Sequence, residues 1–501
     1  MAPNLTPDNI TLPEQYDLDI TRHEMDENIF PLPQSAGQFK DLGSGKKYIP
    51  EPAMPSPFSN ERYITDIGSG SQFVKFYKDL TYQPSAMALA RDHRFSQEPI
   101  EPIPSHSKAA VREMKDLIAT EMIKRSMSNG MRMDQEIIAL GTGSASPSNW
   151  RGGNISPFTP MVNVLASGTL LNLDNRRSII LDCGEGTVAT MKRLFPPEEV
   201  TKIFGNLGLI YVSHLHSDHH LGLIGLLKKY IEIQERLPIE SRKPVFIIAP
   251  IRLITSLYEF SQVEHLKLDE YLVPFNAYDL IPHYLRTATN RPSKLDQGLY
   301  DGLLDLMSLK SIETCFVPHC LAAYGIGITD KSGFKVVYSG DCRPSRELVA
   351  LGQDATLLIH EATLADHELD SALEKMHSTT SEAIDVGRQM NAQNIFLTHF
   401  SQRYVRVPEF VLEWDKSKQE DGGGKYENVS IAFDRMRVRV GDLWKIGRMY
   451  PVFDKMYANT AAGRKRKADE MEGEEQGLLE KTKGISHLMT GLPALSEQRA
   501  G

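Results

Sequence analysis

The sequence predicts an α/β sandwich, a fold in which helices cover the outer faces of packed β-sheets. Two patterns support this prediction. From residue 135 onward, short apolar runs of strand length alternate with stretches of helical periodicity, and no internal repeat is present. Several of these runs also end in a glycine turn or in a histidine or carboxylate, and open α/β sheets place their functional sites at such strand ends.

The first half of the expected core supplies four strands. They are short apolar runs within residues 135–143, 178–186, 207–212 and 244–250. The first two end in glycine turns, and the second leads into a helix through Phe195. A further helix is expected over Leu221–Tyr230, and residues 251–310 are mixed and partly helical.

The second half is denser in strands. Strand-like runs cover residues 312–319, 324–329, 334–341, 355–360 and 394–399, and the stretch 429–440 closes the set. Helix signals lie between some of them, notably after Ser381. This alternation is typical of an α/β sandwich.

Both ends of the chain differ in composition from this core. Residues 1 to about 104 are rich in Pro and Ser, and prolines at 50, 52, 55 and 57 exclude a helix there. One helix is expected after Ser107, where an apolar stripe predicts a packing face: Val111, Met114, Leu117, Ile118 and Met122. We therefore divide the chain into a largely disordered extension (residues 1–130), a folded domain (131–455) and a charged, disordered tail (456–501).

Composition limits the classes to which the protein can belong. Of the 501 residues, 41% are hydrophobic, which suffices for a sizeable core, and the net charge of -9 argues against indiscriminate nucleic-acid binding. The four cysteines form no CxxC pair, so reduced thiols are expected. No apolar run is long enough to span a membrane, and the first residues do not resemble a signal or transit peptide. These features predict an intracellular protein.

A histidine cluster carries the strongest chemical signal. It reads His214-Leu215-His216-Ser217-Asp218-His219-His220 and connects the expected strand 207–212 to the helix that follows. Imidazole nitrogens and carboxylate oxygens are ligands of zinc-class metals. In extended backbone, side chains two apart point the same way, so His214 and His216 could close on one ion, while Asp218 and His219 could face a second. A solvated histidine-rich loop is the alternative, but this pattern at a strand end favours a metal site.

Ligand-type residues also follow several later strands. They are His319, Asp341, His360, Glu361 and His399. One such histidine is usually packed in a core, but so many together indicate convergence on the cluster. By coordination chemistry, His214, His216 and His319 could hold one zinc, and Asp218, His219 and His399 a second, with Asp341 as the bridge.

Such a centre suits attack on a phosphodiester. Two metals about 3.5–4 Å apart lower the pKa of water and neutralise charge on the reacting oxygens. The departing alkoxide must also be protonated by a general acid. His377, in His377-Ser378-Thr379, and Glu361 are left without a metal, and together they are a candidate acid with an orienting carboxylate.

At this point the motifs resemble the metallo-β-lactamase fold and, within it, ribonuclease Z, a family of tRNA 3′-processing endonucleases. The matching pieces are Leu140–Ala145, Leu181–Thr187, the histidine cluster, Ser339–Asp341, His360–Thr363, His377–Thr380, His399–Tyr404 and Ala432–Asp434. The cluster alone marks the broad hydrolase superfamily, whereas the His-Glu-Ala-Thr and His-Ser-Thr pieces single out ribonuclease Z. The likeness covers about Gln135 to Tyr450 and is greatest to the catalytic half of the long eukaryotic form.

The resemblance implies an αββα sandwich and a zinc-dependent endoribonuclease. The substrate would be precursor tRNA, hydrolysed after the discriminator nucleotide so that the 3′ trailer is removed and a 3′-hydroxyl remains. The metal ligands would be the seven assigned above, holding two Zn²⁺ or other divalent ions. Asp218 would also orient or deprotonate the attacking water, and His377 with Glu361 would shuttle the proton.

Three departures from the family concern how the RNA is held. The family's Pro-x-Lys-x-Arg-Asn loop, near the cleavage end of the RNA, appears here as Pro147–Asn154 without its lysine, which puts CCA discrimination in question. No Gly-Pro dipeptide marks the arm with which the short form grips tRNA. Residues 1–130 are too few for the half that carries this arm in the long form. A homodimer, or a separate arm-bearing partner, would compensate.

Two alternative functions stay open from the sequence. One is another hydrolase of the superfamily, acting on a phosphodiester, lactone or thioester, and the other is a non-catalytic RNA-binding relative. The His377 and Glu361 motifs count against the first, and the complete ligand set counts against the second. In the tail, the basic cluster Arg464–Lys467 predicts a nuclear-import signal, with the mitochondrion or cytoplasm as alternative locations and a solvated charge run as the alternative explanation.

Overall fold

The computed structural model describes residues 25, 26, 29, 105–127, 133–144, 166–286, 292–401, 428–450 and 452. Several predictions fall outside these residues, namely those on the Pro147–Asn154 loop, the Arg464–Lys467 cluster, the tail and most of the amino-terminal extension. The domain boundaries at 130/131 and 455/456 also stay predictions. Among the described residues, no helix combines the length and apolar character needed to cross a membrane.

The first sheet has seven strands in the described part of the chain, in the order β13-β1-β2-β3-β4-β5-β6. They are β1 Glu136–Gly141, β2 Gly168–Asp174, β3 Arg177–Cys183, β4 Leu207–Tyr211, β5 Val245–Ala249, β6 Leu272–Asn276 and β13 Arg437–Arg439. Pairing is antiparallel from β13 to β3 and parallel from β3 to β6. The parallel half therefore brings the carboxyl ends of β3 and β4 to one edge.

The second sheet, within the same described ranges, has six strands in the order β12-β11-β10-β9-β8-β7. They are β7 Leu309–Phe316, β8 Tyr324–Asp330, β9 Lys335–Tyr338, β10 Leu357–Glu361, β11 Ile395–Thr398 and β12 Val429–Ile431. β7, β8 and β9 pair antiparallel, whereas β9 to β12 are parallel. The carboxyl ends of β7, β9, β10 and β11 consequently lie at the same edge.

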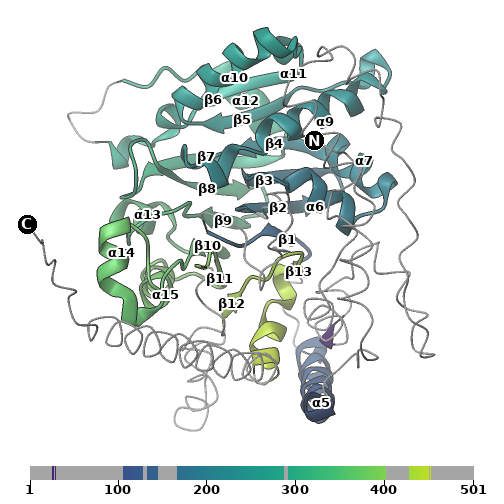
Figure 1. Cartoon of the computed structure of the whole chain (residues 1–501), viewed down its shortest axis with the longest axis vertical. Coiled ribbons are helices and arrows are strands. Elements are labelled where there is room, and N and C mark those ends of the chain that lie inside the picture. Colours follow the sequence, from purple (N-terminus) through teal and green to yellow (C-terminus); the bar gives the residue numbers. More distant parts are fainter. Residues whose placement is uncertain are drawn as a thin grey trace, which may run out of the picture.

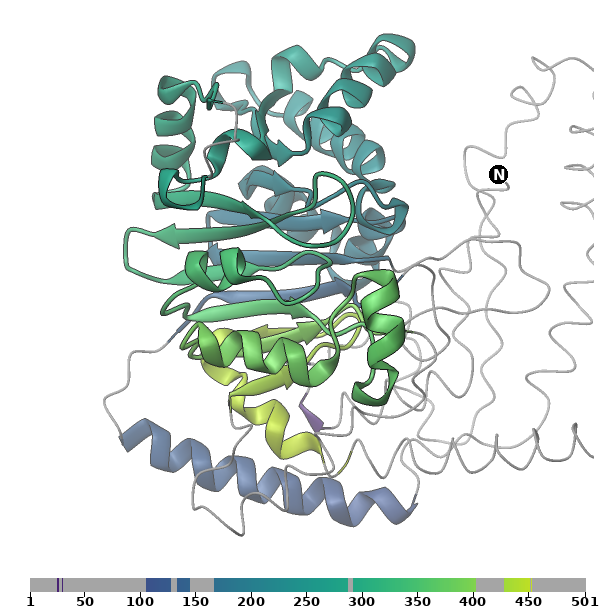
Figure 2. The ribbon, with the colours of Figure 1, turned by 90° about the vertical axis from the view of Figure 1, so that its left-hand side faces the viewer.

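Helices cover the outer face of each sheet, which gives the four layers of an αββα sandwich (Figures 1 and 2). The first sheet is covered by α6 Thr187–Leu194, α7 Pro197–Asn206, α9 Leu223–Glu235 and α10 Ile251–Glu264, and the second by α13 Arg346–Leu351 and α15 Thr380–Gln389. The other helices are α5 Ser105–Met127, α8 Ser217–His220, α11 Leu268–Tyr271, α12 Gln297–Leu306 and α14 Leu369–Lys375. The predicted fold class is confirmed.

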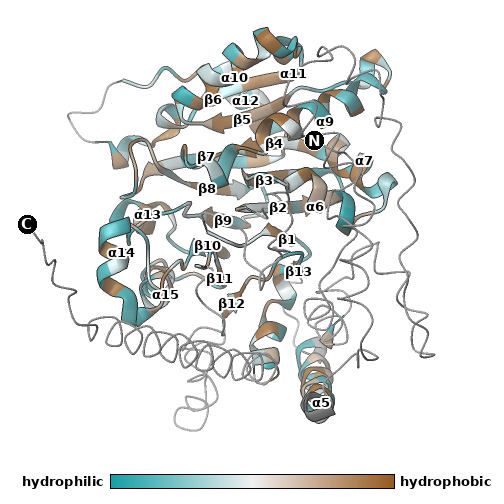
Figure 3. Cartoon of the chain, viewed as in Figure 1, coloured by the Kyte–Doolittle hydropathy of each residue, from teal (hydrophilic) through white to brown (hydrophobic). Residues whose placement is uncertain are grey.

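Alternating side chains along the strands of the first sheet pack into two separate hydrophobic cores. Ile179 and Leu181 of β3 pack between the sheets, whereas Ile180 packs beneath the helices of the outer layer. Burial of such a side chain stabilises the fold by about 1.5–3 kcal/mol. Strands buried on both faces are therefore apolar along their length, as Figure 3 shows for β4 and β5.

Four sequence expectations differ from the structure. β2 and β6 were not predicted. The expected single strand 429–440 is two strands, β12 and β13, which belong to different sheets. Between them Asp434 accepts hydrogen bonds from the backbone and the hydroxyl of Thr142, which holds the crossing segment against the end of β1. The histidine cluster itself begins a short helix, α8, before α9.

The fourth difference concerns the apolar stripe on α5. Val111, Met114 and Ile118 are buried, but Leu117 is 53% exposed and Met122 is 49% exposed. Leu117 lies on another side of the helix, given 100° per residue, and Met122 lies beyond the last buried residue of the stripe. Near this end, the guanidinium of Arg125 lies 4.6 Å from the ring centre of Trp444.

Candidate metal centre

The candidate site lies at the edge where the carboxyl ends of both sheets meet. From the first sheet, the segment after β4 supplies His214 and His216, and α8 supplies Asp218 and His219. From the second sheet come the residues at the ends of β7, β9, β10 and β11: His319, Asp341, Glu361 and His399. The sheets are joined here, since the backbone N–H of Tyr324 donates to the carbonyl of Ser213 at 3.1 Å.

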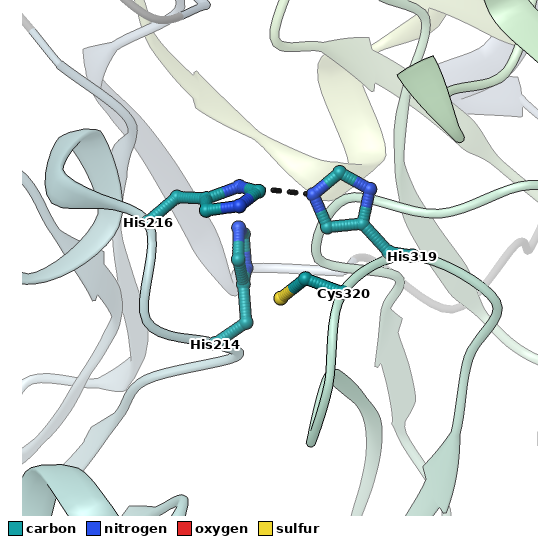
Figure 4. A group of neighbouring side chains, drawn as sticks. All are labelled: His214, His216, His319 and Cys320. Atoms are coloured by element: carbon teal, nitrogen blue, oxygen red, sulfur yellow. Dashed lines mark hydrogen bonds between the residues drawn. The ribbon is translucent and has the colours of Figure 1, made fainter. Parts of the chain in front are cut away.

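Three histidines form the first group of potential ligands (Figure 4). Nε2 of His319 lies 3.0 Å from Nδ1 of His216. The ring of His214 lies 4.6 Å from that of His216 and 4.9 Å from that of His319, measured between ring centres. One nitrogen from each ring and Sγ of Cys320 form a group of four potential ligand atoms. No two of these atoms are more than 4.8 Å apart.

Asp218, His219 and His399 form the second group. The Nε2 atoms of His219 and His399 are 3.2 Å apart. Oδ2 of Asp218 lies 3.4 Å from Nε2 of His399 and 3.6 Å from Nε2 of His219. All three side chains are buried, so their polar atoms face one another rather than water.

The carboxylate of Asp341 lies between the two groups. Its Oδ2 is 3.1 Å from Nε2 of His219, 3.7 Å from Nε2 of His214 and 3.8 Å from Nε2 of His319. Its Oδ1 is 3.3 Å from Nδ1 of His399. This is the position expected of a bridging ligand.

Two buried polar atoms support the fit of metal ions here. Nε2 of His214 and Oδ1 of Asp341 are buried, and neither makes a hydrogen bond. An unsatisfied buried polar group costs about 1–3 kcal/mol. A cation bound between the two groups would satisfy both atoms, and the nitrogen and oxygen donors match the preferences of zinc-class metals.

The electrostatics of the pocket favour the ligand forms of the three histidines of the first group and of Asp218. Burial, with the neighbouring imidazoles, lowers the pKa of His214, and burial lowers the pKa of His216 and His319, which keeps these rings neutral. Burial opposes ionisation of Asp218, but the hydrogen bond to His399 and the charge of His219 outweigh it and lower its pKa. For His219, the carboxylates of Asp341 and Asp182 outweigh burial and raise its pKa. The pocket therefore favours positive charge between its carboxylates.

Asp182 is a residue of the site for which the sequence predicted no role. It lies one residue before the end of β3 with a φ of 55°, and its Oδ2 lies 2.7 Å from Nδ1 of His219. The same carboxylate accepts hydrogen bonds from the hydroxyls of Tyr338 at 2.6 Å and Ser213 at 2.8 Å. A carboxylate on the far nitrogen of a ligating histidine fixes its tautomer and orientation. The sequence signal that could have identified Asp182 was its place in the Leu181–Thr187 motif, at the end of an expected strand.

Asp182→Asn is expected to lower metal affinity by about 10–100-fold, because the amide keeps the shape of the side chain but loses the charge that holds His219. Metal dissociation constants from chelator competition give the measurement. Asp354→Asn is the matched control, since Asp354 is exposed, distant from the centre, and has a φ of 56°, which Asn adopts readily. Unchanged metal affinity in a folded Asp182→Asn protein would show that this carboxylate serves the fold alone.

His377 and Glu361 form a pair beside the metal groups. Nδ1 of His377 lies 2.9 Å from Oε1 of Glu361, and the ring of His377 stacks on that of His399 with ring centres 5.7 Å apart. Glu361 is held in turn by the backbone N–H groups of Cys342 and Thr363, at 2.8 Å and 3.1 Å. Burial opposes the charged form of His377, but the Glu361 carboxylate outweighs it and raises the pKa of His377 to about 9.

Hydrogen bonds from His319 and Arg343 hold the loop that carries His377 beside the candidate metal centre. Nδ1 of His319 donates to the carbonyl of Met376 at 2.8 Å. Arg343 donates to the carbonyl of His377 at 2.6 Å and forms an ion pair with Glu382, which closes the capping box of α15 with Thr379. A candidate metal ligand and the candidate acid are therefore positioned by the same short segment.

The structure thus brings all nine predicted site residues together. Their roles as ligands, acid and orienting group stay predictions. Two histidines of the sequence motifs, His220 and His360, do not belong to the metal groups. Nε2 of His220 hydrogen-bonds to the carbonyl of Leu215, and the buried side chain of His360 lies against Cys342.

Comparison with known proteins gives a consistent result. The family model described as "Anti-Pycsar protein Apyc1" matches residues 136–409. Zinc phosphodiesterase ELAC protein 2 of Macaca fascicularis is 39% identical over 327 residues, which cover 64% of this chain and 35% of the relative. Ribonuclease Z 1 of Schizosaccharomyces pombe is 35% identical over 310 residues, which cover 62% of this chain and 35% of the relative. The chain therefore spans about a third of the length of these curated relatives.

A solved structure supports the same likeness. The long form RNase Z from yeast has a TM-score of 0.55 and 30% sequence identity over 66% of this chain and 45% of that one. The resemblance to ribonuclease Z and to the metallo-β-lactamase fold, predicted from the motifs, is confirmed.

Proposed function

The chain belongs to the family described as anti-Pycsar protein Apyc1, and within it we propose a zinc-dependent endoribonuclease of the ribonuclease Z type. The reaction is hydrolysis of the phosphodiester after the discriminator nucleotide of precursor tRNA, which removes the 3′ trailer. Similarity to proteins named zinc phosphodiesterase and ribonuclease Z supports this proposal. The observation that carries it is the His377–Glu361 pair, which lies against two groups of metal ligands joined by Asp341.

The metal centre is proposed to hold two Zn²⁺. His214, His216 and His319 would bind one ion, Asp218, His219 and His399 the other, and Asp341 both. When bound, the two ions supply an acidified water molecule and positive charge for the phosphate oxygens.

The protein residues supply the proton transfers. Asp218, whose carboxylate lies beside His219 and His399, accepts a proton from the attacking water and orients that water toward the phosphorus. His377 protonates the departing 3′ oxygen of the discriminator ribose. Because Nδ1 of His377 is held by Glu361, Nε2 is the nitrogen that can face this oxygen. The product is a tRNA with a 3′-hydroxyl, and the phosphate stays on the trailer.

Docking of the RNA and location in the cell are further parts of this proposal. We propose that a homodimer or an arm-bearing partner contributes to the tRNA-binding surface, since the sequence carries no Gly-Pro dipeptide of the kind that marks the arm of the short form. From the cluster Arg464–Lys467 we infer a nuclear location, which imaging of the tagged chain with and without these four residues tests.

Cleavage of a precursor tRNA tests the function directly. The purified, zinc-loaded protein is expected to cut once, after the discriminator, and a chelator is expected to abolish the cut. An isolated trailer oligonucleotide and a simple aryl phosphodiester are the comparison substrates. If only the aryl phosphodiester is hydrolysed, the chain is a hydrolase with another substrate. If neither substrate reacts although both metals are bound, the non-catalytic alternative replaces the proposal.

A further inference from the structure

Cys320 lies beside the first group of metal ligands. All four cysteines of the chain are free thiols in the described residues; Cys183, Cys315 and Cys342 are buried, and Cys320 is partly exposed. Cys320 directly follows His319 in the chain. Figure 4 shows its sulfur directed toward the side chain of His214. Its Sγ lies within 4.8 Å of a ring nitrogen of each of the three histidines.

The surroundings of the sulfur leave it available for a metal. The hydrogen bond from its thiol to the carbonyl of Leu321 is long, at 3.8 Å, and therefore weak. Independently, Nε2 of His214 is fully buried and has no hydrogen-bond partner, and it belongs to the same group of four donors. A buried nitrogen without a partner next to a thiol indicates that something binds between them.

The proposed bridging carboxylate, Asp341, lies closer to the second group than to the histidines of the first. Oδ2 of Asp341 is closer to His219, at 3.1 Å, than to His214 or His319, at 3.7 Å and 3.8 Å. Asp341 groups with His214 and His219, and with His319 and His377, whereas Cys320 is the donor that groups with all three histidines of the first site.

We propose that Sγ of Cys320 is a further protein ligand, beside the bridging Asp341, of the metal ion held by His214, His216 and His319. Zinc binds thiolate sulfur at about 2.3 Å and imidazole nitrogen at about 2.0–2.1 Å, so a small rotation of the Cys320 side chain brings the sulfur into range. The thiol loses its proton to solvent as the metal–sulfur bond forms. A soft thiolate favours zinc over manganese or magnesium, so Cys320 sets the metal preference of this position. The inference rests on the metal centre of the proposed function but not on the choice of RNA as substrate.

Cobalt(II) substitution tests this ligand by spectroscopy. The metal-free protein is loaded with two equivalents of Co²⁺, and the near-ultraviolet spectrum is compared with that of Cys320→Ser. The native protein is expected to show a thiolate-to-cobalt charge-transfer band, which Cys320→Ser loses completely. Cys315→Ala, which removes a buried thiol of β7 away from the centre, is the matched control and is expected to keep the band.

Thiol labelling provides a second readout that does not depend on activity. In the metal-free protein, a small disulfide reagent is expected to modify one thiol rapidly, at Cys320, and zinc loading is expected to block that reaction. If two cobalt ions bind without the charge-transfer band, Cys320 is not a ligand, and the metal centre stands without it. If no cobalt binds, the metal centre itself is wrong, and with it both this inference and the proposed function.

Discussion

Replacement of His377 by alanine is expected to slow cleavage of precursor tRNA by about 10²–10⁴-fold, the usual contribution of a general acid. The reason is that His377, which is outside the proposed ligand set and contacts Glu361, is the imidazole proposed to protonate the departing oxygen. The metal content is expected to stay unchanged, because all seven proposed ligands remain. The measurements are single-turnover cleavage rates and metal content by mass spectrometry on the same preparation.

His220→Ala is the matched control for this variant. His220 belongs to the same cluster and bonds to the carbonyl of Leu215 through Nε2, but it does not join the metal groups. Its removal is expected to change the rate little. A His377→Ala protein that loses metal, or that cleaves at the native rate, would contradict the assignment of His377 as the acid.

Asp341→Asn is expected to have the largest effect of any isosteric change at the centre. The carboxylate lies within 3.8 Å of ligands from both groups, so the amide removes the charge that joins them. Loss of several kcal/mol of transition-state stabilisation corresponds to a fall of roughly 10³-fold or more in rate. In contrast to His377→Ala, this variant is expected to lose metal as well.

Metal titration by calorimetry, with cleavage rates on the reloaded protein, separates the two effects. Asp354→Asn again provides the control, because it makes the same chemical change at an exposed position remote from the centre. Full occupancy of both metal positions in Asp341→Asn, with rates near those of the native protein, would exclude a bridging role for this carboxylate.

The site was more predictable from the sequence than the fold around it. Parallel strands deliver their carboxyl ends to a common edge, so a His or Asp after each apolar run could be expected to converge before any geometry was known. That reasoning located His319, Asp341 and His399 although they are far from His214 in the chain. It could not exclude His360, since neighbouring residues at a strand end point to opposite faces, and here the side chain of His360 lies against Cys342.

What could not be predicted depends on contacts between distant segments. The division of residues 429–440 between two sheets follows from the bond between Asp434 and Thr142, which are 292 positions apart. The exposure of Leu117 and Met122 on α5 reflects how far the surface beneath that helix extends. The role of Asp182 required knowing that the end of β3 lies beside His219, because an aspartate at a strand end carries the same pattern whether it binds a metal or holds a ligand.

The division of the proposed ligands between the two sheets would make bound metal ions part of the fold's thermodynamics. His214 to His219 are fixed to one layer, and His319, Asp341 and His399 to the other, so separating the layers would break both proposed coordination spheres at once. Ions that bind the folded chain alone stabilise it by RT ln(1 + [M]/Kd), which is about 2.7 kcal/mol when free metal exceeds the dissociation constant 100-fold. The resistance of the sandwich to heat and proteolysis is therefore expected to rise and fall with the concentration of free metal.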